Sequence, residues 1–349
     1  MTPPRKLGWM EDLIMRWQTQ ERYLRNLLAQ AFGIPVLGQI HFAVPAGSST
    51  SLYEEWARTE MDIPANLLFT GSQAPALAFN ACSANRNDVV LVFPGNYALT
   101  SELAWSKAQT HLMGLGGPAQ GNDYGESNNS IYTETADVNY AVNVTGNHCR
   151  FLNIDFTNCA ADADGLAGLL LNAYACQFKD CSFQGVLNST QDVAANASLH
   201  IAGLASNYRF EDCHIGNNMW RTRTAALSGA LSYIATAYPY PQHGIFRRCQ
   251  FVVWSETSTV GIVRLADGNC MGMLHIFDRC LFHNVSTSWA VTLASVFVRE
   301  EQVRTSTIAL QDCFSIGCDE WQVGDTGTQF QTNNANAEAS GGLGAEATA

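Results

Sequence analysis

The sequence predicts an all-β protein built as a parallel β-helix, and three observations lead to this fold class. A six-residue phrase (aromatic, two polar residues, Cys, any residue, apolar) recurs about every 30 residues through the second half of the chain. Each copy follows a short apolar run punctuated by Gly and Asn, which is too short for a helix. Hydrophobic residues make up 47% of the 349 residues and charged residues only 14%, which excludes a disordered chain. Strand–turn–strand repeats of this length are typical of β-helix coils.

The repeated phrase sets the phase of each coil. In the copy Phe-Lys-Asp-Cys-Ser-Phe, Cys181 and Phe183 are two residues apart and share one strand face. Phe178 lies three residues before Cys181, so the chain must bend on the polar pair between them. Stacked coils would place equivalent side chains in interior ladders, where Cys serves as a small buried hydrophobe and not as a ligand. The predicted ladder is Cys181, Cys213, Cys249, Cys280 and Cys313, with Ile154 at the equivalent position of an earlier copy.

The first polar position of each phrase carries a charge of alternating sign. In coil order these residues are Lys179, Glu211, Arg247 and Asp278. Each would face an opposite charge on the next coil and contribute about 0.2–1 kcal/mol, or less where it is exposed. We therefore expect this charge ladder to set the register of the coils and to have no part in catalysis.

Residues 9–32 are predicted to form a helix with apolar side chains at alternating spacings of three and four residues. Two interpretations are open. The helix forms a coiled-coil seam with a partner chain, or it packs on the first coil and caps its open end. In both cases the helix is an arm that contacts a partner or the β-helix. The expected contact residues are Met10, Leu13, Trp17, Leu24 and Leu27.

The remaining segments complete the predicted organisation. A short helix is expected near residues 74–85, and the polar residues 117–137 are predicted to form a long protruding loop. The end of the chain is rich in Gly, Ala, Thr and Asn without periodicity, so it needs a neighbouring subunit to be ordered. The predicted units are the helical arm 1–34, a connecting segment 35–87, the β-helix 88–320 and an extended low-complexity tail 321–349.

Composition and charge exclude several classes of protein. The net charge is −12, so the basic footprint of a nucleic-acid-binding protein is missing. No apolar run reaches the length of a membrane span, and the N-terminus lacks the apolar core of a secretory signal. Eleven cysteines occur without a C-x-x-C pair, which argues against a zinc finger and favours a reducing cytosol. We expect no cofactor and no metal.

Acidic residues are the candidates for catalysis. Glycoside hydrolysis needs two carboxylates about 5–9.5 Å apart across a cleft. Asp155, Asp162 and Asp164 form the richest acidic cluster, but the last two lie in an Ala-Asp-Ala-Asp-Gly turn, where solvated acids are common. We therefore assign no catalytic residue. The other acids considered are Asp192 and the loop residues Asp123, Glu126 and Glu134.

Two segments and the Phe-x-x-Cys-x-Phe coils resemble a known group. Asn87-Asp88-Val-Val-Leu-Val-Phe-Pro-Gly and Thr110-His-Leu-Met-Gly-Leu-Gly are similar to the opening strands of the pectate-lyase-like right-handed parallel β-helix proteins of tailed-phage virions. The resemblance covers residues 70–320, with Asn87 in place of the usual Gly. Two segments of true pectate lyases, Arg-x-Pro-x-x-Arg and Trp-Ile-Asp-His, do not occur.

The resemblance implies a role in a virion, because members of this group recur as capsid decoration, cement and head-fibre proteins. We expect a non-enzymatic structural protein that binds the major capsid protein on the outer capsid surface as a homotrimer, after assembly in the host cytoplasm. We expect no nucleic acid or membrane partner. The alternative is a tailspike or head-fibre protein that binds or depolymerises a host surface polysaccharide. That alternative needs an acidic pair in a groove near aromatic residues such as Trp220, Trp254 or Trp289.

Overall fold

The structure is a computed structural model of the whole chain, and it is described here where its placement is defined. Side chains of the first helix are described from Thr19 onward. The described residues are 8–33, 35–45, 50–116, 129–219, 223–225, 228–235, 238–265, 270–286, 293–299, 307–323 and 329–332.

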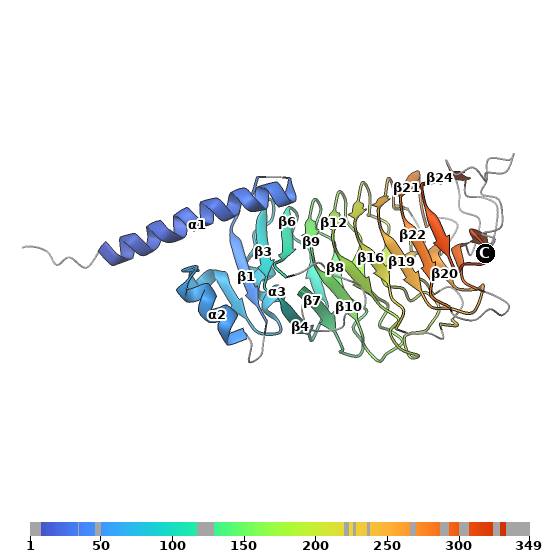
Figure 1. Cartoon of the computed structure of the whole chain (residues 1–349), viewed down its shortest axis with the longest axis horizontal. Helices are drawn as coiled ribbons and strands as arrows, with labels where there is room; N and C mark the ends of the chain where they lie inside the picture. Colours follow the sequence, from blue (N-terminus) through green and yellow to red (C-terminus); the bar gives the residue numbers. More distant parts are fainter. Residues whose placement is uncertain are drawn as a thin grey trace, which may run out of the picture.

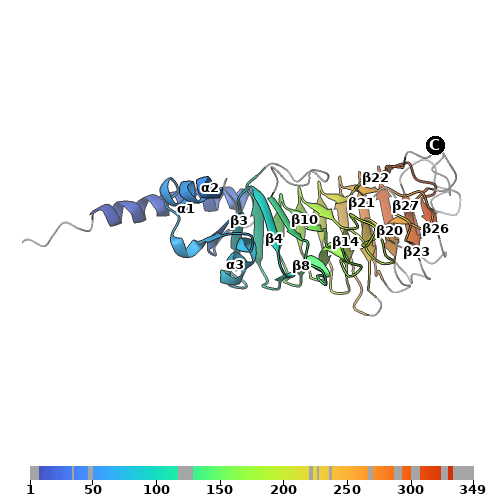
Figure 2. The same ribbon diagram turned by 90° about the horizontal axis from the view of Figure 1, so that it is seen from below.

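The chain folds into an elongated right-handed parallel β-helix, which confirms the predicted fold class (Figures 1 and 2). In the described part of the chain, three parallel sheets of 11, 8 and 8 strands run along the body. Each coil contributes one strand to each sheet in turn. The coils follow one another from the N-terminal to the C-terminal end, so residues about 30 positions apart lie side by side.

Strand bounds follow the predicted coils. Sheet A contains, in spatial order, β2 (Leu68–Thr70), β1 (Ile40–Val44), β3 (Asp88–Val92), β6 (Thr110–Gly114), β9 (Arg150–Leu152), β12 (Gln177–Lys179), β15 (Arg209–Glu211), β18 (Ile245–Arg247), β21 (Leu274–Asp278), β24 (Thr307–Gln311) and β27 (Gln329–Thr332). Sheet B contains β4 (Gly95–Leu99), β7 (Asn129–Thr133), β10 (Asp155–Asn158), β13 (Ser182–Gln184), β16 (His214–Gly216), β19 (Gln250–Val253), β22 (Leu281–Asn284) and β25 (Phe314–Ile316). Sheet C contains β5 (Leu103–Trp105), β8 (Tyr140–Val144), β11 (Ala167–Leu171), β14 (Leu199–Ile201), β17 (Leu231–Tyr233), β20 (Gly261–Leu265), β23 (Ser295–Arg299) and β26 (Gln322–Val323).

The predicted bend inside the repeated phrase is a corner made by a single residue. Asp180 and Asp212 adopt φ values of 53° and 54°, in the left-handed region that Asn and Asp tolerate better than most residues. The N–H of Asp180 donates to the carbonyl of Glu211 on the next coil at 3.0 Å. Because sheet A passes into sheet B within this one residue, the Phe before the corner and the Cys after it both point inward.

Interior ladders of Phe and Cys run along the β-helix. Phe178 stacks on Phe210 with ring centroids 4.6 Å apart, and Phe210 stacks on Phe246 at 4.9 Å. These separations match the spacing between neighbouring strands. The thiol of Cys213 donates to the Phe178 carbonyl at 3.6 Å. All five cysteines of the predicted ladder are buried with free thiols: Cys181, Cys213, Cys249, Cys280 and Cys313.

The alternating charges lie in register across sheet A, as the sequence predicts. Arg247 Nε lies 2.8 Å from Asp278 Oδ2 on the next coil. Glu211, however, forms its ion pair with Arg248, whose Nη2 lies 2.8 Å from Glu211 Oε1. Arg248 also contacts Asp212 at 2.6 Å. The ion-pair partner of Glu211 is thus the corner residue Arg248, whereas the sequence predicted Arg247.

The N-terminal end has a second apolar core on the outer face of sheet A. Ile40, Phe42 and Val44 of β1 point into this core, whereas Ala43 points into the β-helix interior. Helices α1 (Gly8–Phe32) and α2 (Thr50–Thr59) cover the outer core (Figures 1 and 2). Sheet A therefore begins with β1 and β2, earlier than the predicted start at residue 88.

The interior is capped by α3 (Ala74–Ala81) and not by the first helix. Ala78 and Phe79 of α3 belong to the same core cluster as the inward residues of the first coils. The Phe79 ring stacks on Trp105 at 4.3 Å. The N-terminal helix instead packs on the outside, through Leu28 and Phe32. Capping by the first helix was one of the two interpretations that the sequence left open, and the described residues place α3 at this end of the interior instead.

Candidate functional site

Among the described residues, the acids singled out in the sequence do not form one site, and Asp155 is the clearest case. Its carboxylate is buried on β10 and accepts hydrogen bonds from Ser130, Thr157 and Gln184 at 2.9–3.2 Å. Desolvation raises the pKa of this carboxyl group above its usual value, against the opposing effect of these hydrogen bonds. The residue ties β7, β10 and β13 together.

Asp162 and Asp164 lie in an exposed turn, as predicted, and meet Asp137. Carboxylate oxygens of these three residues lie within 4.8 Å of one another. Asp162 Oδ1 accepts the N–H of Asp164 at 3.0 Å, which is a local turn contact. Asp192 lies apart and accepts the N–H groups of Thr224 and Ala225 at 2.7 and 3.2 Å. Of the loop acids, Glu134 is exposed, and Asp123 and Glu126 lie outside the described residues.

Buried histidines are held in the interior by defined hydrogen bonds. His275 Nε2 faces the carbonyls of Pro241 and Gly272 at 3.2 and 3.1 Å, so this nitrogen carries the proton. Nδ1 then faces the hydroxyl groups of Tyr208 and Tyr233 at 3.0 and 3.4 Å and accepts a hydrogen bond from this pair. Burial lowers the pKa of His275 to about 4. The ring is therefore a neutral bridge between coils.

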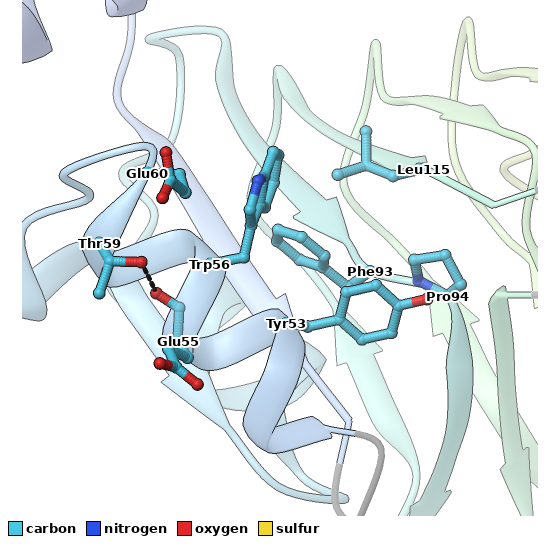
Figure 3. A pocket seen from close by; sticks show the side chains of 8 residues that line it. All are labelled: Tyr53, Glu55, Trp56, Thr59, Glu60, Phe93, Pro94 and Leu115. Atoms are coloured by element: carbon cyan, nitrogen blue, oxygen red, sulfur yellow. Dashed lines mark hydrogen bonds between the residues drawn. The ribbon is translucent and has the colours of Figure 1, made fainter.

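An aromatic pocket, which the sequence did not single out, lies at the N-terminal end (Figure 3). Its volume is about 810 Å³. The lining residues come from α2 and from the ends of β3 and β6 in sheet A. They are Tyr53, Glu55, Trp56, Thr59, Glu60, Phe93, Pro94 and Leu115.

The geometry of this aromatic pocket follows from the packing of α2. Ala57 is fully buried against the outer core, so Tyr53 and Trp56 lie beside Phe93. The Trp56 and Phe93 rings meet edge to face with centroids 6.1 Å apart, and Tyr53 lies 5.6 Å from Phe93. Trp56 is still 47% exposed. Such a hollow with an apolar centre and few polar groups is a typical binding site.

Acidic side chains flank the aromatic pocket. Glu55 and Glu60 are the acidic residues in its lining. The Thr59 hydroxyl donates to the Glu55 backbone carbonyl at 2.7 Å, and the Glu55 carboxylate lies on the surface of α2 (Figure 3). The pocket thus offers an apolar floor with negative charge at its rim. It suits an apolar group that carries positive charge nearby.

Beside this pocket, α1 extends past the end of the body (Figure 1). Leu24 packs partly against the outer core, whereas Leu27 is 44% exposed. The side chains of Met10, Leu13 and Trp17 lie outside the described residues. Of the predicted seam, the two described residues therefore lie next to Leu28 and Phe32, which pack on the β-helix. Among the described residues, no helix is long and apolar enough to cross a membrane.

Of the three tryptophans considered for glycan binding, the structure describes one. Trp254 is half-buried, and its indole nitrogen has no hydrogen-bond partner. Trp220 and Trp289 lie outside the described residues. Trp56, which lines the aromatic pocket, is an exposed ring that the sequence analysis did not consider. A Trp on an amphipathic helix gives no sign in sequence that one ring face stays open.

Comparison with known proteins found similar solved structures at low sequence identity. No family model and no curated protein matches it. Among solved structures, pectin methylesterase PemA from Erwinia chrysanthemi is 12% identical with a TM-score of 0.40, over 84% of this chain and 87% of that chain. A pectate lyase is 11% identical with a TM-score of 0.47, over 84% and 74% of the two chains. A protein of Geobacillus virus E2 is 12% identical with a TM-score of 0.43, over 75% and 58%.

These neighbours correct one expectation from the sequence. We expected the chain not to be an enzyme, but the solved structures similar to it include pectin methylesterases and a pectate lyase. The absence of the two pectate lyase segments therefore does not exclude an enzymatic activity. At such low identity the likeness shows the fold alone and assigns no reaction. The chain belongs to the class of right-handed parallel β-helix proteins.

Proposed function

We propose that the chain is a structural protein of a phage virion that attaches through its N-terminal end, with the β-helix as a projecting rigid body. The observation that carries the proposal is the placement of α1. This helix has 25 residues, and its last turns pack on the body through Leu28 and Phe32 while the rest extends past it (Figures 1 and 2). A helix that extends past the body in this way is suited to a second contact.

The aromatic pocket supports attachment at this same end. Trp56 and Leu115 are 47% and 41% exposed around its opening. Aromatic side chains in a hollow are the usual anchors of protein interfaces. The partner we propose is the major capsid protein, which would place an apolar side chain in the pocket and Lys or Arg beside Glu55 and Glu60. The homotrimer belongs to the same proposal, with α1 as the seam between copies.

The first experiment is quantitative mass spectrometry of purified virions, with the ratio of this chain to the major capsid protein as the readout. Capsid decoration predicts copies in the hundreds. A handful to a few tens of copies would instead place the chain at the tail or at a vertex. Absence from purified virions would contradict the proposal.

A pair of matched variants tests attachment by α1. Leu27→Glu places a charge on the exposed part of α1, and Leu204→Glu places the same charge on the side of the β-helix, where Leu204 is 58% exposed. We expect Leu27→Glu to lower binding to capsids at least tenfold and to lower the sedimentation coefficient of the oligomer. Leu204→Glu should change neither. Equal binding by both variants would remove α1 from the proposal.

A second candidate function is the binding or cleavage of a host surface polysaccharide. The observation in its favour is the aromatic pocket, which combines the open ring of Trp56 with the nearby carboxylates of Glu55 and Glu60. Rings and carboxylates are groups that can contact sugar faces and hydroxyls. Cosedimentation with host capsule or lipopolysaccharide measures binding, and a reducing-end assay after incubation measures turnover. Trp56→Ala should abolish either activity if the pocket is the site.

A further inference from the structure

Three side chains with metal-binding atoms meet at the N-terminal end of the β-helix interior, away from the aromatic pocket. His41 lies on β1, Cys82 directly follows α3, and Asp88 is the first residue of β3. One ring nitrogen of His41, Cys82 Sγ and a carboxylate oxygen of Asp88 all lie within 4.8 Å of one another. All three residues are buried. The fold thus brings a nitrogen, a sulfur and an oxygen donor to one point from three separate segments.

His41 is the residue that points to a ligand. Its side chain is 2% exposed, and neither Nδ1 nor Nε2 has a hydrogen-bond partner. A buried imidazole nearly always has a partner on at least one nitrogen, because an unpaired buried polar group is unfavourable. The nearest ring is Phe69, with centroids 5.9 Å apart, and it offers no acceptor. A metal ion bound at one nitrogen would account for this imidazole.

Asp88 is already oriented as a metal-binding carboxylate usually is. The N–H of Gln39 donates to Asp88 Oδ1 at 2.7 Å, and the N–H of Ser83 donates to Oδ2 at 2.6 Å. Arg86 Nε lies 3.5 Å from Oδ1 on the outer side. Each carboxylate oxygen accepts two hydrogen bonds or one bond and a metal, so these contacts fix the group and leave it able to bind an ion. A Cβ at Gly38 would lie 2.0 Å from Oδ1, so only glycine permits this close backbone approach.

We propose that His41, Cys82 and Asp88 bind a zinc ion that fastens β1, the end of α3 and β3 together at the capped end of the β-helix. Imidazole, thiolate and carboxylate are the three ligand types of Zn²⁺, and three protein ligands leave the fourth tetrahedral position for water. The thiolate and the carboxylate together balance the charge of the ion. Binding therefore replaces the Cys82 proton by zinc and releases one proton to solvent.

The protonation of the free site agrees with this chemistry. Burial lowers the pKa of His41, which keeps the ring in the neutral form that binds metals. Burial raises the pKa of the Cys82 thiol to about 12, so the thiol keeps its proton until an ion displaces it. The Cys82 thiol donates to the Ala78 carbonyl at 3.4 Å, a weak contact that a thiolate gives up.

Cobalt titration of the full-length, chelator-treated protein tests the proposal, because Co²⁺ bound to a thiolate gives a charge-transfer band and visible tetrahedral bands. We expect one Co²⁺ per chain, displaced by Zn²⁺. Cys82→Ser should abolish the charge-transfer band, and His41→Gln should lower the affinity at least tenfold. The matched control is Cys249→Ser, which removes a buried ladder thiol far from the site and should bind as the wild type does.

A second measurement uses the wild-type chain alone, so it does not depend on the folding of any variant. Equimolar Zn²⁺ should raise the Tm of the chelator-treated protein, since an ion that binds the folded state stabilises it. Absence of a cobalt spectrum together with an unchanged Tm would overturn the proposal. Retention of the charge-transfer band in Cys82→Ser would overturn it as well, because the thiolate would then come from elsewhere.

Discussion

The Phe ladder gives the sharpest prediction for stability, and Phe210 is its central member. The Phe210 side chain is 0% exposed. It stacks on Phe178 and Phe246 at 4.6 and 4.9 Å and meets Phe183 edge to face at 5.5 Å. Replacement by Ala removes the ring and both stacking contacts. Because hydrogen-bonded strands hold neighbouring coils at a fixed spacing, the cavity cannot close.

The expected cost follows from this geometry. Phe→Ala in a core costs about 3–5 kcal/mol, and the rigid coil places Phe210→Ala near the upper half of that range. Phe210→Leu keeps most of the volume and loses the aromatic contacts, so we expect a loss of about 1 kcal/mol. Phe314 is 69% exposed on β25, and Phe314→Ala should change stability by less than about 0.5 kcal/mol.

Urea denaturation followed by circular dichroism and tryptophan fluorescence measures these differences. The two signals should change together if the coils unfold as one unit. The order Phe210→Ala, Phe210→Leu, Phe314→Ala in decreasing cost is the expected result. A loss below about 1 kcal/mol in Phe210→Ala would refute the reasoning, because the coils would then be able to close over the missing ring.

Three further predictions concern pH, charge and thiols. Burial lowers the pKa values of His200 and His275 to about 4. As the pH falls below 6.5, the unfolded chain therefore binds protons at these residues before the folded chain does. The free energy of unfolding decreases between pH 6.5 and pH 4, by about 3 kcal/mol for each histidine. His275→Gln should flatten this dependence in denaturation curves measured from pH 7 to pH 4, and an unchanged slope would contradict it. Arg247→Glu replaces the ion pair between Arg247 Nε and Asp278 Oδ2, which are 2.8 Å apart, by two like charges. We expect it to lower the Tm, and Arg247→Gln to lower it less. Equal Tm values for both variants and the wild type would exclude the charge ladder as a source of stability. Cys159 is the one cysteine of eleven that is not buried, so a thiol reagent should modify about one thiol per native chain quickly, and Cys159→Ser should abolish that reaction.

The sequence alone was sufficient for the fold class, because the coil is a local pattern repeated at a regular spacing. The Phe-x-x-Cys-x-Phe phrase encodes two inward side chains on either side of a bend, and the structure places that bend on Asp180 and its equivalents. A second corner in each coil went unrecognised. It falls on His148 and Ala175, with φ values of 59° and 56°. The Ala is not a typical turn residue, so residue type does not mark this corner.

The sites were decided by the tertiary structure, because their members come from distant segments. Trp56 and Phe93 form the aromatic pocket only because α2 packs on the outer face of sheet A. His41 and Asp88 become neighbours through the pairing of β1 with β3. Sequence spacing carries no trace of such contacts. A repeat encodes what each coil does with its own residues, whereas a site at the end of the β-helix depends on how the non-repeating segments close over it.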